Sequence, residues 1–194
     1  MSSTNPSYPS EEQIQDKFFK QFLTVRNSVR VKNWTGWSYK KGRNHREETK
    51  FYREFDLATF YKDARGLTLE GYEVKGWRKT SKKEGKMIPP AFGDGIDQAL
   101  ALLQQGADFA HVIYPEPTNP QDKTNLSELC DHYAHNIGII YVRNDLSSFF
   151  DHRPPQQNPY TTSDRKKKML ASLMAGGNFS DMGELPTWAK QQQY

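Results

Sequence analysis

The sequence has little of what marks a secreted, disulfide-bonded or membrane protein. Of its 194 residues one is a cysteine, Cys130, which excludes an internal disulfide. The longest aliphatic run, residues 99–103, is far below the roughly 18 apolar residues that a membrane-spanning helix needs. Residues 1–12 also lack a basic start followed by an apolar stretch, the pattern of a secretory signal. We therefore expect a protein of the reducing cytoplasm with no membrane partner.

Common catalytic and metal-binding patterns are missing as well. The chain has no glycine-rich loop ending in Lys-Ser or Lys-Thr and no Gly-x-Ser-x-Gly, which argues against a P-loop ATPase and a serine hydrolase. Cys130, His132 and His135 lie close together in sequence, but helical steps of about 100° place them on different faces. We therefore interpret these three residues as ordinary helix residues and not as zinc ligands.

Aromatic residues are plentiful, and charge is unevenly distributed. The chain contains 4 Trp, 10 Tyr and 11 Phe, which is enough apolar material for a core. Basic residues outnumber acidic ones by 11 to 3 in residues 16–53 and by 6 to 1 in residues 75–86, whereas acids lead by 9 to 3 in residues 87–163. Basic segments interleaved with aromatic side chains are typical of nucleic-acid binding. A solvated basic face explains the charge alone equally well.

Composition divides the chain into three segments. Residues 1–10 are rich in Ser, Pro and Asn and are predicted to be a flexible N-terminus. Residues 11–150 carry the helix and strand patterns of one domain. In residues 151–194, the prolines at 154, 155 and 159 predict a linker, followed by a basic helix over residues 164–174 and a loose tail.

Hydrophobic periodicity within residues 11–150 predicts alternating helices and strands. A capping box from Ser10 to Gln13 opens a helix over residues 11–25, and Asp94 is the predicted N-cap of a second helix over residues 94–105. A third helix is expected over residues 126–136, and strands over 29–39, 51–61, 67–77, 109–114 and 138–142. This order predicts an α/β fold with a mixed β-sheet flanked by helices.

The hairpin formed by the second and third strands carries the most specific signal. A turn centred between residues 64 and 65 pairs residues whose numbers sum to 129, so Asp56 lies opposite Glu73. Because side chains alternate along a strand, Glu73 and Lys75 project to the same face. The opposite face is expected to carry Val74 with Phe55, Leu57 and Tyr72.

Two carboxylates on one face repel each other, so the hairpin needs a cation to offset that repulsion. Mg²⁺ fits this need, because it usually takes one or two carboxylates together with waters and substrate phosphate. Lys75 would then orient or deprotonate an attacking water, or neutralise charge in the transition state. The simpler alternative is a cross-strand salt bridge from Lys75 to Asp56 or Glu73 at a solvent-facing edge.

Asp56 and the run Glu73-Val74-Lys75 resemble the motif of the PD-(D/E)XK nuclease superfamily, which includes archaeal Holliday-junction resolvases. That family places an acid and a Glu-x-Lys on consecutive strands, in a core whose element order residues 11–142 follow. Phe55 stands where the family has its characteristic proline. The resemblance implies a restriction-endonuclease-like three-layer core, in the order αβββαβαβ, and a nuclease of the repair, recombination or restriction type.

The same resemblance implies roles for individual residues. Asp56, Glu73 and the Val74 carbonyl would bind Mg²⁺, for which Mn²⁺ could substitute, and Lys75 would assist the nucleophilic water. Many members add an acid from the first helix, which Glu11 or Glu12 could supply. Others add a Gln on the helix after the Glu-x-Lys strand, where Gln98 stands, although helical-wheel arithmetic predicts that Gln98 is exposed.

A basic run follows the Glu-x-Lys strand directly and would grip neighbouring phosphates of DNA, or of RNA. It consists of Arg78, Lys79, Lys82, Lys83 and Lys86. A flexible polar loop is the equally weighted alternative. We expect a metal-dependent deoxyribonuclease, as a monomer or homodimer. Two other functions stay open: a non-catalytic nucleic-acid-binding module with the same fold, and an adaptor that docks through its C-terminal segment.

Overall fold

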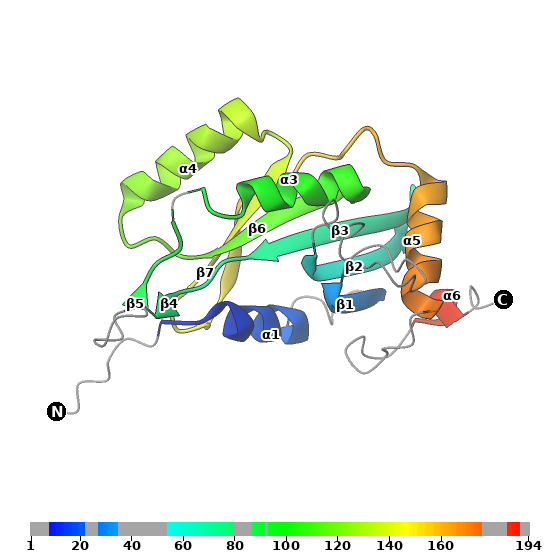
Figure 1. The fold of residues 1–194 in the computed structure, drawn as a ribbon, viewed down its shortest axis with the longest axis horizontal. Helices are drawn as coiled ribbons and strands as arrows, with labels where there is room; N and C mark the ends of the chain where they lie inside the picture. Colours follow the sequence, from blue (N-terminus) through cyan, green and yellow to red (C-terminus); the bar gives the residue numbers. More distant parts are fainter. Residues whose placement is uncertain are drawn as a thin grey trace, which may run out of the picture.

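The protein is built on a mixed six-stranded sheet with helices on both faces (Figure 1). The computed structural model describes residues 8–21, 27–34, 54–79, 87–91, 93–175 and 186–190. β3, β6 and β7 run parallel, while β1, β2 and β8 are antiparallel to their neighbours. In spatial order the strands are β1 (Ser28–Trp34), β2 (Phe55–Asp63), β3 (Gly66–Val74), β6 (Phe109–Pro115), β7 (Ile137–Val142) and β8 (Phe149–Arg153).

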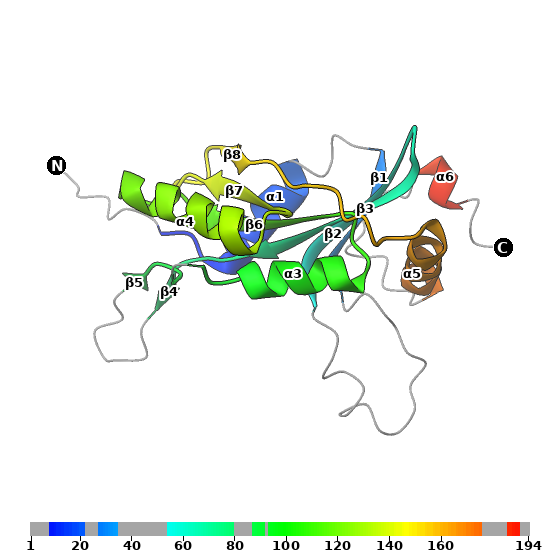
Figure 2. The same ribbon diagram turned by 90° about the horizontal axis from the view of Figure 1, so that it is seen from above.

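The helices form the outer layers. In Figure 1, α1 (Glu11–Gln21) lies below the sheet, and α3 (Ile96–Gln105) and α4 (Pro120–Tyr133) lie above it. Near the end of the sheet where β2 turns into β3 are α5 (Ser163–Ala175) and α6 (Thr187–Lys190), as both ribbon views show (Figures 1 and 2). A separate two-stranded ribbon, β4 (Arg78–Lys79) and β5 (Met87–Ile88), follows β3.

Alternation along the strands divides the core into two clusters. On one face Leu57, Tyr72 and Val74 pack with Ile14 and Phe18 of α1. On the other face the strands pack with α3, α4 and α5. Burying each of these large apolar side chains stabilises the fold by about 1.5–3 kcal/mol. Strands that are apolar on both faces therefore lie inside the sheet, where helices cover both faces. All six residues of β7 are buried, as its continuous apolar run predicts.

Two local predictions are confirmed. Gln13 Oε1 accepts a hydrogen bond from the Ser10 N–H at 2.9 Å, and Ser10 Oγ accepts one from the Gln13 N–H at 3.3 Å, which is the capping box. The β2–β3 ladder runs from Asp63–Gly66 to Leu57–Tyr72, so paired residue numbers sum to 129. The hairpin therefore has the register on which the site prediction depends.

Phe55 differs from the predicted alternation. It packs with the α3 cluster instead of with Val74, and its ring lies 5.2 Å from that of Trp34. The reason is Gly71, where an added Cβ would lie 2.8 Å from the Phe55 ring. The missing side chain leaves the space that Phe55 fills.

Two helix starts also differ from the predictions. The N-cap of α3 is Gly95 rather than Asp94, because the chain enters the helix with a positive φ of 89° that favours glycine. α4 begins at Pro120, six residues before the predicted start. Its N-cap is Asn119, whose side chain accepts the Gln121 N–H at 3.0 Å, and proline suits the first helical position.

Within residues 151–175 and 186–190, which the structure describes, the chain beyond residue 150 packs against the same fold; the rest of the predicted tail lies outside the described residues. β8 crosses the predicted boundary and pairs with β7. The basic helix α5 buries Met169, Leu170 and Leu173 in the α3 cluster. Trp188 of α6 donates a hydrogen bond to the Asn27 carbonyl at 3.2 Å. The predicted basic helix over residues 164–174 is therefore confirmed, and its apolar side packs into the core.

Two further predictions concern the N-terminal segment and the absence of a membrane-spanning helix. Residues 8–10 lie against the fold, since the Trp77 N–H donates to the Pro9 carbonyl at 3.0 Å, whereas residues 1–7 fall outside the described part. None of the helices in the described ranges has both the length and the apolar composition for crossing a bilayer.

Candidate active site

Asp56 and Glu73 come together at the open end of the β2–β3 hairpin, away from its turn and next to the carboxyl end of β3. The backbone ladder stops at Leu57–Tyr72, and Asp56 continues the pairing with its side chain: Oδ2 accepts the Val74 N–H at 2.7 Å. Because the N–H and C=O of a strand residue point to the same side, the Val74 carbonyl also faces the Asp56 side of the strand. The hairpin therefore groups three oxygen donors in one place.

Lys75 lies against Glu73 inside the protein. Its Nζ donates to Glu73 Oε1 at 2.6 Å, and 5% of Lys75 and 2% of Glu73 are exposed. The two side chains thus share a face, as predicted, but this pair is buried instead of lying at a solvent-facing edge. A buried ion pair loses its hydration on both partners, so its presence needs an explanation other than stability.

The site carries more acid than the single ammonium of Lys75 offsets. Burial raises the pKa of Asp56 to about 6, and the charges of Glu11 and Glu54 add to this. Burial and the Asp56 charge raise the pKa of Glu73 to about 7, against the lowering effect of Lys75. Both acids therefore favour their protonated forms more than a surface carboxyl does.

The first helix brings a third acid to this site. α1 begins against Gly76, where an added Cβ would lie 2.1 Å from the Glu11 nitrogen. The charge of Glu11 raises the pKa values of both Asp56 and Glu73. Glu12 is exposed on the outer side of the helix. Of the two acids that the resemblance offered, the structure therefore places Glu11 near the carboxylate pair.

A glycine loop covers the other side of the pair. Gly93 and Gly95 have positive φ values of 75° and 89°, and a Cβ on Gly95 would lie 2.7 Å from Lys75 Cε. Between them, the Asp94 carbonyl accepts a hydrogen bond from the Tyr114 hydroxyl. This approach requires glycine, and it covers Lys75 on this side.

The remaining predicted site residues are more dispersed. Gln98 is half-buried in the first turn of α3 instead of exposed. Lys79 is exposed on β4, and Arg78 is exposed with its guanidinium 2.8 Å from Asp94 Oδ2. Lys82, Lys83 and Lys86 lie outside the described residues. Arg78 and Lys79 thus flank the site.

The donor set fits a hard cation of the Mg²⁺ type better than zinc. Asp56, Glu73 and the Val74 carbonyl offer oxygens only, which Mg²⁺ prefers. Over the described ranges, no cluster of three or more His, Cys, Asp or Glu side chains has the geometry to hold a metal by itself. A cation here would complete its coordination with waters or phosphate, as Mg²⁺ commonly does.

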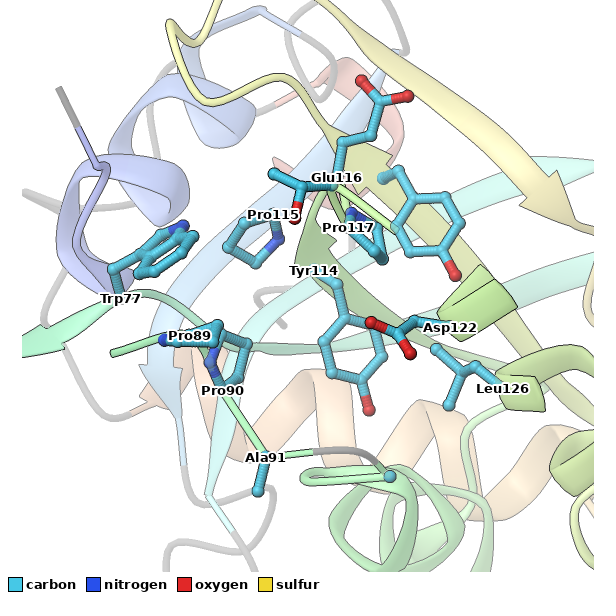
Figure 3. Close-up of a pocket in the computed structure, with 13 residues that line it drawn as sticks. Trp77, Pro89, Pro90, Ala91, Tyr114, Pro115, Glu116, Pro117, Asp122 and Leu126 are labelled. Atoms are coloured by element: carbon cyan, nitrogen blue, oxygen red, sulfur yellow. The ribbon is translucent and has the colours of Figure 1, made fainter. Parts of the chain in front are cut away.

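A cavity that the sequence analysis missed adjoins the site (Figure 3). Its volume is about 200 Å³, and it lies beside the carboxyl ends of β3 and β6. Trp77, two residues after Lys75, forms one wall, and Tyr114 lies across from it. The signal in the sequence is the repeated proline at positions 89, 90, 115 and 117, all of which line the cavity.

Comparison with known proteins leaves the function open. No protein-family model matches this chain, and neither does any curated protein. A solved structure that it resembles is the SPO1766 protein of unknown function from Silicibacter pomeroyi, at 12% identity and a TM-score of 0.48, over 90% of this chain and 88% of that chain. Function must therefore be inferred from the site itself.

Proposed function

We propose that this protein is a Mg²⁺-dependent nuclease that hydrolyses DNA phosphodiester bonds. The observation that carries the proposal is the grouping of half-buried Asp56 with buried Glu73 and Lys75 at the open end of the β2–β3 hairpin. Perturbed acids clustered beside a cleft are typical of catalytic sites. A second carboxylate beside one buried ion pair adds repulsion and desolvation cost, which stability alone does not explain.

The fold supports the same proposal. α1 covers one face of the sheet, α3, α4 and α5 pack on the other, and the acid and the Glu-x-Lys lie on consecutive strands. We infer from this arrangement a restriction-endonuclease-like core. In open sheets with parallel strands, ligands bind outside the carboxyl ends of those strands, which is where the site lies.

The acidic side chains of the site have the role of binding the metal ion. Asp56 and Glu73, with the Val74 carbonyl, would hold the ion, and Glu11 would add negative charge to the same region. Bound there, Mg²⁺ would neutralise charge on the scissile phosphate and make an attacking water more acidic. Asp56 keeps its orientation because the Val74 N–H fixes one of its oxygens.

Lys75 acts on the water and the phosphate. Its ammonium donates to Glu73 in this structure and carries further protons that hydrogen-bond an attacking water or a phosphate oxygen. The water oxygen attacks phosphorus and releases a proton to solvent, the bond from phosphorus to the leaving sugar oxygen breaks, and that oxygen takes up a proton from solvent. Arg78 and Lys79 bind phosphates beside the cleaved bond, which sets position rather than sequence.

The test is cleavage of labelled single-stranded, duplex and four-way-junction DNA with Mg²⁺, Mn²⁺ or EDTA. Wild type is compared with Glu73→Gln and Lys75→Ala. Loss of either group should lower the rate by about 10³-fold or more, since each acts in the transition state. Glu12→Gln is the matched control, because it removes a nearby but exposed carboxylate, while Glu11→Gln should slow cleavage measurably.

The outcomes separate the alternatives. Cutting that disappears with EDTA and in both site variants, with unchanged thermal unfolding, supports the nuclease. DNA binding without metal-dependent cutting would contradict it and favour a non-catalytic nucleic-acid-binding module, in which the same residues form an ion-pair cluster. Absence of both would refute a role on DNA, and the same substrates made of RNA then test the RNA alternative.

A further inference from the structure

The cavity beside the carboxylate pair has the shape and chemistry of a site for a flat aromatic ligand. In Figure 3 Trp77 stands on one side, Asp122 and Leu126 on the other, and Tyr114 between them. Prolines fill the space above and below. Rigid rings and prolines lose little conformational entropy when a ligand stacks on them. The pocket is therefore preorganised for a planar ring.

The wall of the pocket contains a polar group with an unsatisfied hydrogen-bonding capacity. Tyr141 lines the pocket and is fully buried, and its hydroxyl has no hydrogen-bond partner within the part of the chain that the structure describes. An unsatisfied buried hydroxyl costs free energy unless a ligand or a water completes it. Asp122, on the same side, presents a carboxylate that accepts hydrogen bonds. A ligand with apolar faces and a polar edge satisfies both.

The pocket and the catalytic group share their walls. Gly93 lines the pocket, and Gly95, two residues later, lies against Lys75 and Glu73. Tyr114 lines the pocket and donates its hydroxyl to the Asp94 carbonyl between those glycines. A molecule in the pocket is thus a near neighbour of any phosphate at the carboxylates.

We propose that this pocket binds an unpaired nucleobase next to the scissile phosphate, so that the preferred substrate is single-stranded or frayed DNA. This inference rests on the nuclease function proposed above. A base supplies two flat faces for stacking and an edge of donors and acceptors for Tyr141 and Asp122. A base within a duplex has its faces covered by its neighbours, so entry requires an unpaired or extruded nucleotide.

The surroundings favour a nucleotide over an apolar peptide segment. Trp77 is followed directly by Arg78 and Lys79, whose exposed side chains lie where the backbone of a bound strand would continue. β4 pairs with β5, and the next residues, Pro89 and Pro90, line the pocket. Cations beside a stacking platform are the usual arrangement for binding single strands.

The test is fluorescence binding with a 12-nucleotide single strand that carries one 2-aminopurine, and with the same strand in a blunt duplex. The full chain is used in EDTA at about 0.15 M salt, so that no cutting interferes. Stacking in the pocket quenches 2-aminopurine, and we expect the single strand to bind at least tenfold more tightly than the duplex. A gain of that size corresponds to one stacked base.

Two variants locate the site, and a third controls for them. Ala91→Trp fills the pocket from an exposed position and should weaken single-strand binding about 10- to 100-fold. Tyr141→Phe keeps the shape and should weaken it about 3- to 10-fold without lowering the melting temperature, because the lost hydroxyl has no hydrogen-bond partner among the described residues. Tyr160→Phe, at an 87% exposed tyrosine, should change neither.

The outcomes keep the two proposals apart. Normal single-strand binding by Ala91→Trp and Tyr141→Phe, or equal affinity for single strand and duplex, overturns the base pocket and assigns the cavity to another ligand, such as an apolar segment of a partner protein. The nuclease then stands if EDTA-sensitive cutting is present. If 2-aminopurine is quenched by wild type and less by Ala91→Trp and Tyr141→Phe, but the protein does not cut DNA, the base pocket is supported and the nuclease is refuted.

Discussion

Two buried lysine–carboxylate pairs lie at opposite ends of the same sheet and differ in their surroundings. Lys166 of α5 donates to Asp108 at 2.9 Å, and Lys75 donates to Glu73 at 2.6 Å. The other oxygen of Asp108 accepts the Leu69 N–H at 2.8 Å, so this pair is one acid and one base with complementary hydrogen bonds. The pair of Lys75 has Asp56 and Glu11 beside it.

The comparison shows how burial serves two purposes. Around Asp108, the hydrogen bonds join α5, β3 and the segment between β8 and α5, where the Asn158 N–H donates to the Asp108 carbonyl. Around Glu73, burial brings Asp56 and Glu11 beside one ion pair. The first arrangement is expected of a structural contact, and the second of the metal site proposed above.

The largest difference should appear when each lysine is removed. Lys166→Met leaves a buried Asp108 carboxylate without its cation, and we expect the free energy of unfolding to fall by about 3–5 kcal/mol. Lys75→Met should cost clearly less, because Glu73, with a pKa of about 7, takes up a proton instead. Urea unfolding at pH 7 measures both. Equal losses would mean that the two pairs are alike.

A second prediction concerns pH. The raised pKa of Glu73 means that, between about pH 4.5 and 7, the folded protein holds a proton that the unfolded chain has lost. Its contribution to stability therefore falls as the pH rises through this window. From pH 5 to pH 8 wild type should lose ~2 kcal/mol relative to Glu73→Gln. Parallel curves for the two proteins in urea titrations would disprove the raised pKa.

A third prediction uses two glycines with positive φ. Gly66→Ala, at φ 111° with open space around it, should cost only backbone strain of about 1–2 kcal/mol. Gly95→Ala carries similar strain, and its Cβ also displaces Lys75 from Glu73. It should therefore slow cleavage strongly, whereas Gly66→Ala should leave the rate unchanged. Equal rates in the two variants would show that Lys75 tolerates being moved.

The smallest effects belong to the exposed cations. Arg78→Ala or Lys79→Ala should weaken DNA binding several-fold and lower the slope of log affinity against log salt by about 1 each. Lys167→Ala, on the exposed side of α5, is the matched control. If Lys167→Ala weakens DNA binding as much as Arg78→Ala or Lys79→Ala does, the basic residues attract DNA through the whole surface and not through β4.

The sequence predicted the parts of the site that depend on local rules. Strand alternation and a short turn sufficed for the hairpin register, and the pairing of Asp56 with the Glu-Val-Lys strand followed. The burial of Lys75 could not be predicted, because it depends on Gly95, twenty residues away in sequence. The pocket was missed for a similar reason: its walls come from four separate segments.

The same limit explains the C-terminal segment. Pro154 and Pro155 are typical of a linker, and the run from Arg165 to Lys168 is typical of a solvated helix. Neither pattern shows that Met169 and Leu170 meet the α3 cluster, or that Lys166 finds a carboxylate. Contacts between residues far apart in sequence decided both.

The bond between Lys166 and Asp108 has a consequence for how the protein is made. The two residues are 58 positions apart, so a chain still emerging from the ribosome completes the β2–β3 hairpin well before α5 is available. Until then Asp108 has no ammonium to pair with, and the sheet lacks the apolar cover of that helix. The order of synthesis thus delays the closing of this part of the core until α5 has been translated.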